Sequence, residues 1–174
     1  MKSVKPHSID RYKYLSDDEH IRLTRVLETF ECRDTLLIEL ALNTGARASE
    51  LLSIKQSELN DKDQTVMIRG AKGSNDREIP LRPDLYERVR LYCTNNPGQN
   101  VFDIKYRRLD QIWQFYRPNN KKFHSLRHTF AINLYKKSRD LKLVQVALGH
   151  RAISSTMVYA DYVFKTEELR KLIL

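Results

Sequence analysis

Cysteine is scarce in this sequence, and the two cysteines present lie far apart. They are Cys32 and Cys93 in a chain of 174 residues, and neither belongs to a CxxC pair. A disulfide-stapled scaffold or a zinc site made of cysteines needs more thiols at closer spacing. This scarcity excludes both classes and indicates reduced thiols in a cytoplasmic protein.

Long apolar runs are missing as well. No stretch reaches the roughly 18–20 apolar residues that a membrane-spanning helix needs, and the polar start "MKSVKPHSIDRYKY" is unlike a signal peptide. Glycine and proline are few, at five each, while 41% of the residues are hydrophobic and 30% are charged. This composition is typical of one compact folded domain with no membrane partner, and it excludes a disordered chain.

The positive charge is concentrated in one part of the chain. The formal net charge is +9, and the segment from Ile104 to Arg151 holds 12 Lys and Arg residues against two acids, Asp110 and Asp140. The rest is close to neutral, with 19 basic and 20 acidic residues. Such a block is typical of proteins that bind a polyanion, most simply nucleic acid, but a solvated basic surface has the same composition. Charge alone leaves both interpretations open.

Local patterns predict an α+β domain that is mostly helical. The sequence "SDDE" at Ser16–Glu19 is a capping box and predicts a helix start. The β-rich runs "QTVMIRG" and "REIPL" flank "AKGSND", which predicts an antiparallel hairpin with a polar tip. Apolar periodicity predicts further helices over 35–43, 48–54, 83–94, 106–116, 125–138 and 141–150, the last ended by Gly149.

Six polar residues stand where a plain helical bundle has no need of them. Singly, each has an ordinary explanation: an arginine after a turn makes a surface contact, a hairpin-tip lysine is solvated, and a tyrosine packs in the core. Together they form a set rich in cations and poor in acids. The six are Arg47, Lys72, His124, Arg127, His150 and Tyr159.

Such a set suits the breakage of a phosphodiester bond. Attack on phosphorus builds negative charge on the non-bridging oxygens, which two guanidinium groups can hold bidentately. A lysine can protonate the leaving oxygen, and a histidine can accept a proton or hold a phosphate oxygen. A tyrosine nucleophile keeps the energy of the broken bond in a covalent phosphoenzyme, so rejoining needs no ATP. Because cationic side chains do the work of a metal ion, we expect no metal and no cofactor.

Four stretches of the sequence resemble those of the tyrosine recombinases, the phage integrase family. "TGARASELLSI", "HSLRHTFA" and "LGHRAISSTMVYA" resemble three signature blocks, and "IRGAKGSNDREIPL" resembles a lysine-bearing β-hairpin. The blocks stand in the family's order and spacing and cover about Leu15 to Leu174. The resemblance implies the fold of a tyrosine-recombinase catalytic domain with a small antiparallel sheet. It also implies a site-specific recombinase that cleaves and rejoins DNA strands through a 3′-phosphotyrosine, without metal or ATP.

The resemblance assigns roles to the cations and to one acid. Arg47 and Arg127 match the two arginines that grip the scissile phosphate. Lys72 matches the general acid of the hairpin, which protonates the leaving 5′-oxygen. Glu50, one turn beyond Arg47, resembles an acidic partner that orients the site without reacting.

The histidines and the nucleophile follow in the same way. His124 matches the histidine that assists tyrosine deprotonation, and His150 matches a hydrogen-bond donor to the phosphate. Spacing from "LGH" selects Tyr159 as the nucleophile over Tyr162. Many relatives have a histidine two residues after the nucleophile, where this chain has Asp161, so Tyr162 stays an alternative.

The resemblance also implies an organisation and partners. We expect residues 1–14 to be a linker or the remnant of a missing N-terminal core-binding domain, and residues 15–174 to be the catalytic domain. The tail, about 161–174, is expected to dock on a neighbouring protomer. The expected partners are a double-stranded DNA site and, on that DNA, a homotetramer of protomers that are monomers in solution, in a prokaryotic cytoplasm. The basic block is expected to contact DNA through Lys105, Arg107, Arg108, Lys121, Lys122 and Arg151.

Two alternatives to a recombinase come from other functional classes. The first is a DNA-binding protein without catalysis, which would gain nothing from Tyr159. The second is a metal-dependent nuclease that uses His124, His128 and His150 as ligands. His124 and His128 have the i,i+4 spacing of a helical metal pair, but no carboxylate accompanies them as in HExxH.

Overall fold

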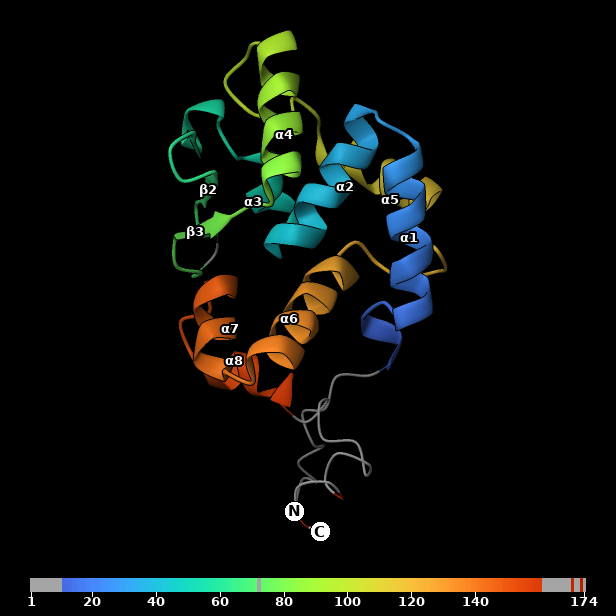
Figure 1. Ribbon diagram of the computed structural model, residues 1–174, viewed down its shortest axis with the longest axis vertical. Coiled ribbons are helices and arrows are strands. Elements are labelled where there is room, and N and C mark those ends of the chain that lie inside the picture. Colours follow the sequence, from blue (N-terminus) through green and yellow to red (C-terminus); the bar gives the residue numbers. More distant parts are fainter. Residues whose placement is uncertain (1–10, 72, 161–169, 171–172, 174) are drawn as a thin grey trace.

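The structure is a computed structural model that describes residues 11–71, 73–160, 170 and 173. Helices predominate in it and a small antiparallel sheet is present (Figure 1), which confirms the predicted fold class, α+β and mostly helical. The described elements are η1 (Arg11–Lys13), α1 (Asp17–Thr29), α2 (Arg33–Thr44), α3 (Ala48–Leu52), η2 (Gln56–Glu58), β1 (Leu59–Asn60), β2 (Thr65–Ile68), β3 (Arg77–Pro80), α4 (Pro83–Asn95), α5 (Tyr106–Tyr116), α6 (Ser125–Ser138), α7 (Leu141–Leu148) and α8 (Ser154–Met157).

Local signals explain where several helices begin and end. The capping box before α1 is formed: the Glu19 N–H donates to Ser16 Oγ at 3.3 Å, and the Ser16 N–H donates to Glu19 Oε2 at 2.8 Å. Asp140 caps α7 because its side chain accepts from the backbone N–H groups of Lys142 and Leu143. Gly149 then ends α7 in the left-handed conformation, with φ of 68°.

The sheet is a meander in the order β1-β2-β3. In the β2–β3 hairpin, Thr65 pairs with Pro80 and Ile68 pairs with Arg77. The predicted hairpin is therefore confirmed, and its loop spans the polar "AKGSND" segment, in which residue 72 is not described. The two-residue strand β1 was not predicted, because two residues carry no alternation that a sequence pattern can reveal.

The buried side chains form two clusters. The larger cluster joins α1 to α5 with the sheet, and the indole of Trp113 is almost fully buried in it. The smaller cluster lies among α6, α7 and the residues after α8, and it includes Ile132, Val144, Leu148 and Tyr159. Helix α6 packs against α2 and thereby connects the two clusters.

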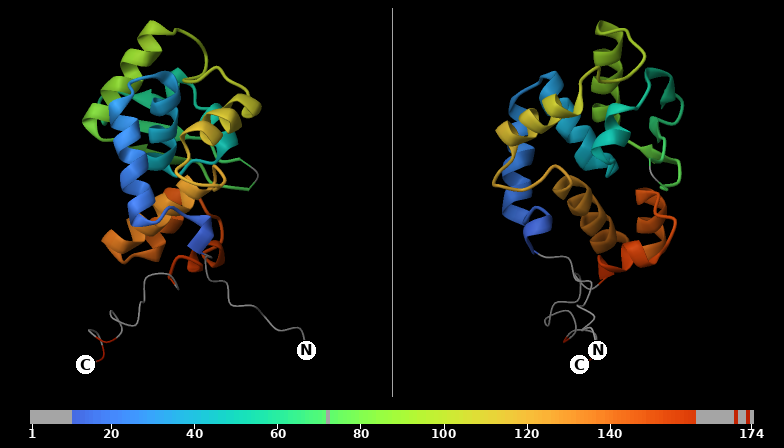
Figure 2. Two further views of the ribbon diagram at one scale, coloured as in Figure 1. Left: turned by 90° about the vertical axis from the view of Figure 1, so that its right-hand side faces the viewer. Right: turned by 180° about the vertical axis from the view of Figure 1, so that it is seen from behind.

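The helices of the smaller cluster lie at one end of the molecule. Figures 1 and 2 show α6, α7 and α8 together at that end, with the sheet and α2 to α5 on the other side. Helix α7 packs against β3, so the hairpin reaches this end as well. Among the helices that the structure describes, none has both the length and the apolar character needed to cross a bilayer.

Candidate active site

The first arginine of the predicted set lies at the junction of α2 and α3. Gly45 ends α2 with φ of 60°, and a Cβ atom there would lie 2.5 Å from the ring of Phe130. The chain then turns and begins α3 at Arg47, whose N–H donates to Glu50 Oε2 at 2.9 Å. The half-buried guanidinium of Arg47 donates to Glu50 Oε1 at 2.9 Å as well. The predicted pair of Arg47 and Glu50 is therefore in direct contact.

The second arginine lies inside the protein. Arg127, in the first turn of α6, donates from Nη1 to the carbonyl of Gly45 and from Nη2 to the carbonyl of Leu148, both at 2.7 Å. These carbonyls belong to the ends of α2 and α7, where helices leave C=O groups without helical partners. Arg127 Nη1 also lies 3.6 Å from Glu50 Oε2. One guanidinium thus connects two helix ends to the shared carboxylate.

Glu50 is the electrostatic centre of this cluster. Its side chain is 0% exposed. Burial alone would raise the pKa of Glu50, but a hydrogen bond from Arg77, the Arg47 backbone N–H and the charges of Arg77 and Arg127 outweigh it and lower the pKa to about 2. Glu50 therefore stays ionised at neutral pH, and the expected role of an orienting acid agrees with its surroundings.

The β2–β3 loop reaches into the same cluster. The N–H of Ala71 lies 3.4 Å from Glu50 Oε1, and the Arg47 guanidinium donates to the hydroxyl of Ser74. The N–H of Asn75 donates to the carbonyl of Gly149 at 2.9 Å. Lys72, the expected general acid, lies outside the described residues, but the described neighbours on both sides of it contact the cluster.

His150 follows the glycine that ends α7. Its Nδ1 lies 2.9 Å from the hydroxyl of Thr156, which holds the ring against α8. Burial and the charges of Arg127 and Arg47 lower the pKa of His150 to about 4. At neutral pH the ring is uncharged, so it can donate one hydrogen bond and accept another.

Tyr159 is buried beside a histidine that the sequence-based assignment gave no part in this chemistry. Only 2% of the side chain is exposed, and its hydroxyl lies 3.0 Å from Nδ1 of His128. Burial raises the pKa of Tyr159 to about 12, although the charges of Arg127 and Arg47 act in the opposite direction. Burial and the charges of His124 and Arg127 lower the pKa of His128 to about 4. In this conformation a neutral phenol therefore faces a neutral imidazole.

His124, not His128, was expected to assist Tyr159. His124 directly precedes α6 and is exposed, and its ring contacts His128 edge-to-face with centroids 4.7 Å apart. Partial desolvation by the packed neighbours and the charges of Arg127 and Arg47 lower the pKa of His124. His128 thus lies between His124 and the Tyr159 hydroxyl. The i,i+4 spacing of the two histidines was the signal for this contact, and it had been considered only for metal binding.

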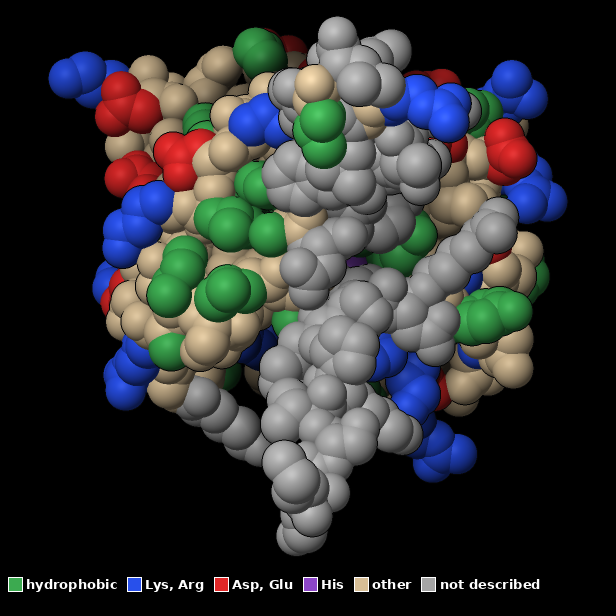
Figure 3. Space-filling model, turned by 90° about the horizontal axis from the view of Figure 1, so that it is seen from below, with side chains coloured by type: hydrophobic (Ala, Val, Ile, Leu, Met, Phe, Trp, Pro, Cys, Tyr) green, Lys and Arg blue, Asp and Glu red, His purple; other side chains and the backbone are tan. Residues whose placement is uncertain are grey.

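The basic residues expected to contact DNA fall into two groups. Lys105, Arg107, Arg108, Lys122 and Arg151 are exposed, although Arg108 also pairs with Asp34 at 3.0 Å. Lys121 is only 7% exposed, because its ammonium group pairs with Glu19 and donates to the carbonyl of Tyr14. The expectation that Lys121 contacts DNA is therefore corrected. Figure 3 views the molecule from below, and Lys and Arg side chains stand around the edge of this view together with Asp and Glu side chains.

The ligand set of the metal-dependent alternative does not come together. Among the residues that the structure describes, no three His, Cys, Asp or Glu side chains are grouped so that they could hold a metal ion. The Nδ1 atoms of His128 and His150 face the hydroxyls of Tyr159 and Thr156 instead. The residues that the structure describes therefore provide no set of ligands for the metal ion of the nuclease interpretation.

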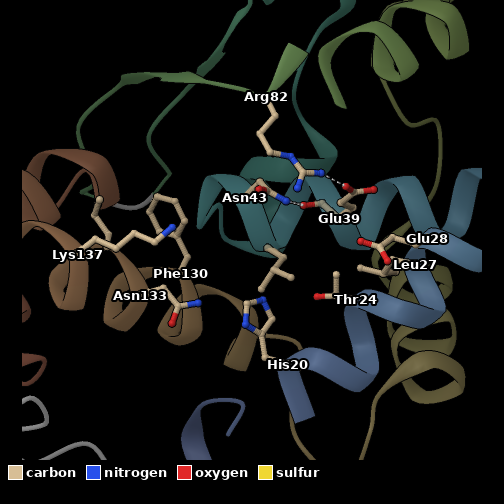
Figure 4. A pocket seen from close by; sticks show the side chains of 12 residues that line it. His20, Thr24, Leu27, Glu28, Glu39, Asn43, Arg82, Phe130, Asn133 and Lys137 are labelled. Carbon is tan, nitrogen blue, oxygen red and sulfur yellow. Dashed lines mark hydrogen bonds and ion pairs between the residues drawn. The ribbon is translucent and has the colours of Figure 1, made fainter. Parts of the chain in front are cut away.

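A cavity of about 370 Å³ lies elsewhere in the molecule. It is bounded by α1, α2 and α6, and Figure 4 shows Arg82 reaching toward Glu39 at its edge. Their ion pair measures 2.8 Å. None of the arginines and histidines of the cluster lines this cavity. The candidate site is therefore a cluster at the junction of α3, α6, α7 and the hairpin, apart from this cavity.

The sequence and the fold were compared with those of known proteins. The sequence model described as "Phage integrase family" matches residues 13–165. The tyrosine recombinase XerA of Thermococcus kodakarensis is 28% identical over 98% of this chain and 67% of its own length. A tyrosine recombinase of Pseudothermotoga lettingae is 32% identical over 75% of this chain and 50% of its own length. The chain thus spans about half to two thirds of the length of these relatives.

Solved structures have the same fold. The XerH site-specific recombinase bound to palindromic difH substrate, in a post-cleavage complex, superposes with a TM-score of 0.75 at 24% identity, over 93% of this chain and 53% of that one. The catalytic domain of bacteriophage HP1 integrase superposes with a TM-score of 0.68 at 24% identity, over 86% of this chain and 87% of that one. The described fold is therefore that of a recombinase catalytic domain.

Proposed function

Since this chain belongs to the phage integrase family, we propose that it breaks and rejoins DNA strands at specific sites through a covalent bond between Tyr159 and a DNA phosphate. The observation that carries the proposal is the cluster in which Arg47 and Arg127 share Glu50. A group of guanidiniums around one buried carboxylate keeps an excess of positive charge at neutral pH. Such an excess of positive charge stabilises the negative charge that develops in the transition state of phosphodiester cleavage.

The proposed reaction begins with attack of the Tyr159 oxygen on phosphorus. The new O–P bond forms as the bond to the 5′-oxygen breaks, so a 3′-phosphotyrosyl link and a free 5′-hydroxyl result. Arg47, Arg127 and His150 hold the non-bridging oxygens, and Lys72 supplies the proton that the leaving oxygen takes up. Rejoining is the reverse, with a 5′-hydroxyl as the nucleophile and the tyrosine as the leaving group.

The Tyr159 proton needs an acceptor. Its hydroxyl lies 3.0 Å from Nδ1 of His128 in this conformation, so His128 accepts the hydrogen bond of the phenol before DNA binds, and we assign the removal of the proton, as Tyr159 moves, to the adjoining pair His124 and His128. The side chains of Tyr159 and Arg127 are both 2% exposed, so neither meets a DNA phosphate in this conformation. Strand cleavage therefore requires the segments that cover Tyr159 and Arg127 to move when DNA binds.

The partner in this proposal is double-stranded DNA. The named structural relatives include XerH bound to its difH substrate, which supports a DNA partner for this chain. A tetramer on two DNA sites, a monomeric state in solution and a place in the prokaryotic cytoplasm stay predictions. The tail at 161–174, expected to dock on a neighbouring protomer, lies largely outside the described residues, as does Tyr162.

Capture of the covalent intermediate tests this function. The protein is incubated in EDTA with a pool of nicked duplexes of randomised sequence, from which a cleaved strand end diffuses away and the adduct accumulates. We expect a protein–DNA adduct that survives denaturation and is absent with Tyr159→Phe. An adduct that persists in Tyr159→Phe would identify Tyr162 or another nucleophile. DNA binding without any adduct would favour the non-catalytic binding protein, and metal-dependent cleavage without an adduct would favour a nuclease.

A further inference from the structure

A third arginine lies at the centre of the cluster, and no role in the chemistry above accounts for it. Arg77 is the first residue of β3, and its side chain is 2% exposed. Its Nη2 donates to Glu50 Oε2 at 2.8 Å. Its Nε and Nη1 are buried and have no hydrogen-bond partner among the described residues. Buried donors are almost always paired, so this arrangement needs a reason.

The way in which the two carboxylate oxygens of Glu50 are shared among its neighbours suggests a reason for this arrangement. Arg47 takes Oε1 at 2.9 Å and Arg77 takes Oε2 at 2.8 Å, while Arg127 stands at 3.6 Å from Oε2. Arg77 and the Arg47 N–H thus occupy the oxygen that Arg127 approaches, and Arg127 donates to its two carbonyl partners. Arg77 itself has no route to DNA, because the hairpin and the end of α7 cover it.

The charges of the cluster point the same way. Three guanidiniums and one carboxylate leave two net positive charges around the place where the phosphate is proposed to bind. A phosphodiester carries one negative charge, and a five-coordinate transition state with a phenolate nucleophile carries two. Without Arg77 a single net positive charge would remain, and Glu50 would compete with the phosphate for Arg47 and Arg127.

The backbone around Arg77 is fitted to it. A Cβ atom at Gly149 would lie 3.1 Å from Nη1 and 3.3 Å from Cδ of Arg77. Gly149 thus lets the guanidinium pack directly against the backbone that precedes His150. The contact brings the Arg77 guanidinium close to His150, whose pKa is lowered by burial and by the charges of Arg127, Arg47 and Arg77.

We propose that Arg77 is a positioning residue for strand cleavage: it occupies Glu50, so that Arg47 and Arg127 keep N–H groups free for a DNA phosphate. This inference rests on the proposed function. Arg77 touches neither DNA nor the reacting atoms. Its effect is carried by the charge of Glu50, and removal of that charge should make Arg77 dispensable.

The experiment measures single-turnover cleavage of a nicked duplex recovered from the adduct selection, with DNA binding measured separately. We expect Arg77→Met to slow cleavage by about 10²-fold, the scale of one lost preorganised donor, with binding changed less than about threefold. The double variant Glu50→Gln/Arg77→Met has the same net charge as the wild type, and it should recover at least about tenfold. Arg69→Met is the matched control, because Arg69 pairs with Glu58 and Asp76 on the exposed side of the same hairpin.

Several outcomes would overturn the inference. If Arg77→Met cleaves DNA within about threefold of the wild-type rate, Arg77 has no role in cleavage. If the double variant cleaves more slowly than Arg77→Met, the loss in Arg77→Met reflects damage to the fold and not the charge of Glu50. If Arg77→Met does not fold, Arg77→Lys decides, because the retained charge should keep cleavage within about tenfold of wild type. A folded Arg77→Lys that has lost cleavage would then contradict the inference. Absence of an adduct with the wild-type protein would instead overturn the proposed function.

NMR titration of the Glu50 carboxyl gives a readout that needs no DNA. In the wild type this group should not titrate above about pH 3, since its pKa is about 2. In Arg77→Met the pKa of Glu50 should rise, because the hydrogen bond and the charge of Arg77, which oppose the effect of burial, are gone. An unchanged Glu50 titration would contradict the inference whatever the protein does to DNA.

Discussion

Single residues in this protein serve the fold and the proposed chemistry at once. Arg127 satisfies the carbonyl groups of Gly45 and Leu148, which belong to different helix ends, and in the proposed function it is also the second arginine that binds the phosphate. Arg47 is half-exposed, and the carboxylate it binds keeps Arg77 as a second partner. The two arginines therefore have similar proposed roles in cleavage but very different structural surroundings.

This difference predicts unequal effects on stability. Arg127→Ala leaves two buried carbonyls without donors, so its unfolding free energy should fall by about 3 kcal/mol. Arg47→Ala should lower it by about 1 kcal/mol or less, because that side chain is partly solvated. Urea denaturation measures both, and each variant should also lose adduct formation. Equal losses of stability would contradict the structural role assigned to Arg127.

A second residue-scale prediction uses the adjacent lysines 121 and 122. Lys122→Ala should weaken DNA binding and reduce the slope of log affinity against log salt by about 1, with stability unchanged. Lys121→Ala should leave Glu19 as a buried, unpaired carboxylate and cost about 3 kcal/mol of stability. Binding isotherms at several salt concentrations and urea denaturation separate the two effects. A salt slope that falls with Lys121→Ala but not with Lys122→Ala would reverse the assignment.

At the scale of elements, the β2–β3 hairpin is attached to the helices that carry the site. Asn75 bonds to the carbonyl of Gly149, Ser74 accepts from Arg47, and Arg77 reaches Glu50. The loop is thus fixed on both sides of residue 72.

The close approach of α7 to the hairpin predicts the effect of a single methyl group. In Gly149→Ala the new Cβ would lie 2.5 Å from the carbonyl oxygen of Asn75, so the hairpin must move. Gly73→Ala is the matched control, because its φ of 82° is equally unfavourable but no atom lies within 4 Å of the new Cβ. Both should lose about 1 kcal/mol through backbone strain, and Gly149→Ala about 1–3 kcal/mol more. Similar melting temperatures for the two variants would show that the hairpin moves away from the new methyl group at little cost in stability.

Local sequence signals predicted the elements well, because caps, turns and periodicity are properties of neighbouring residues. Ser16, the hairpin and Gly149 are examples, and each was found where its pattern indicated. The misassigned or missed residues depend on contacts across the fold. Lys121 is buried by Glu19, about a hundred positions away, and Arg77 meets Glu50 from another element. A single sequence holds no signal for such contacts.

Across the whole molecule, an excess of positive charge favours DNA binding but disfavours any further positive charge at the candidate site. Its basic excess favours DNA, while the cluster holds three arginines, one acid and neutral histidines around a buried tyrosine. Burial and the nearby positive charges keep the pKa of His128 and of His150 at about 4. A charged imidazole in either place would add to charges that the fold already concentrates.

These shifts predict how stability depends on pH. Between about pH 6.5 and 4 the unfolded chain binds protons at both histidines while the folded chain does not, so the unfolding free energy should fall as the pH is lowered. Protonation of Glu50 extends the decrease in unfolding free energy toward pH 2, because the pKa of Glu50 is lower in the folded protein than in the unfolded chain. On the alkaline side, the raised pKa of Tyr159 should lower stability only above about pH 10.

Urea denaturation from pH 4 to 8 should therefore show a plateau near neutrality and a decline below about pH 6.5, and the decline should be shallower in His128→Asn/His150→Asn. A flat profile from pH 7 to 4 would mean that these histidines titrate in the folded protein as they do in the unfolded chain.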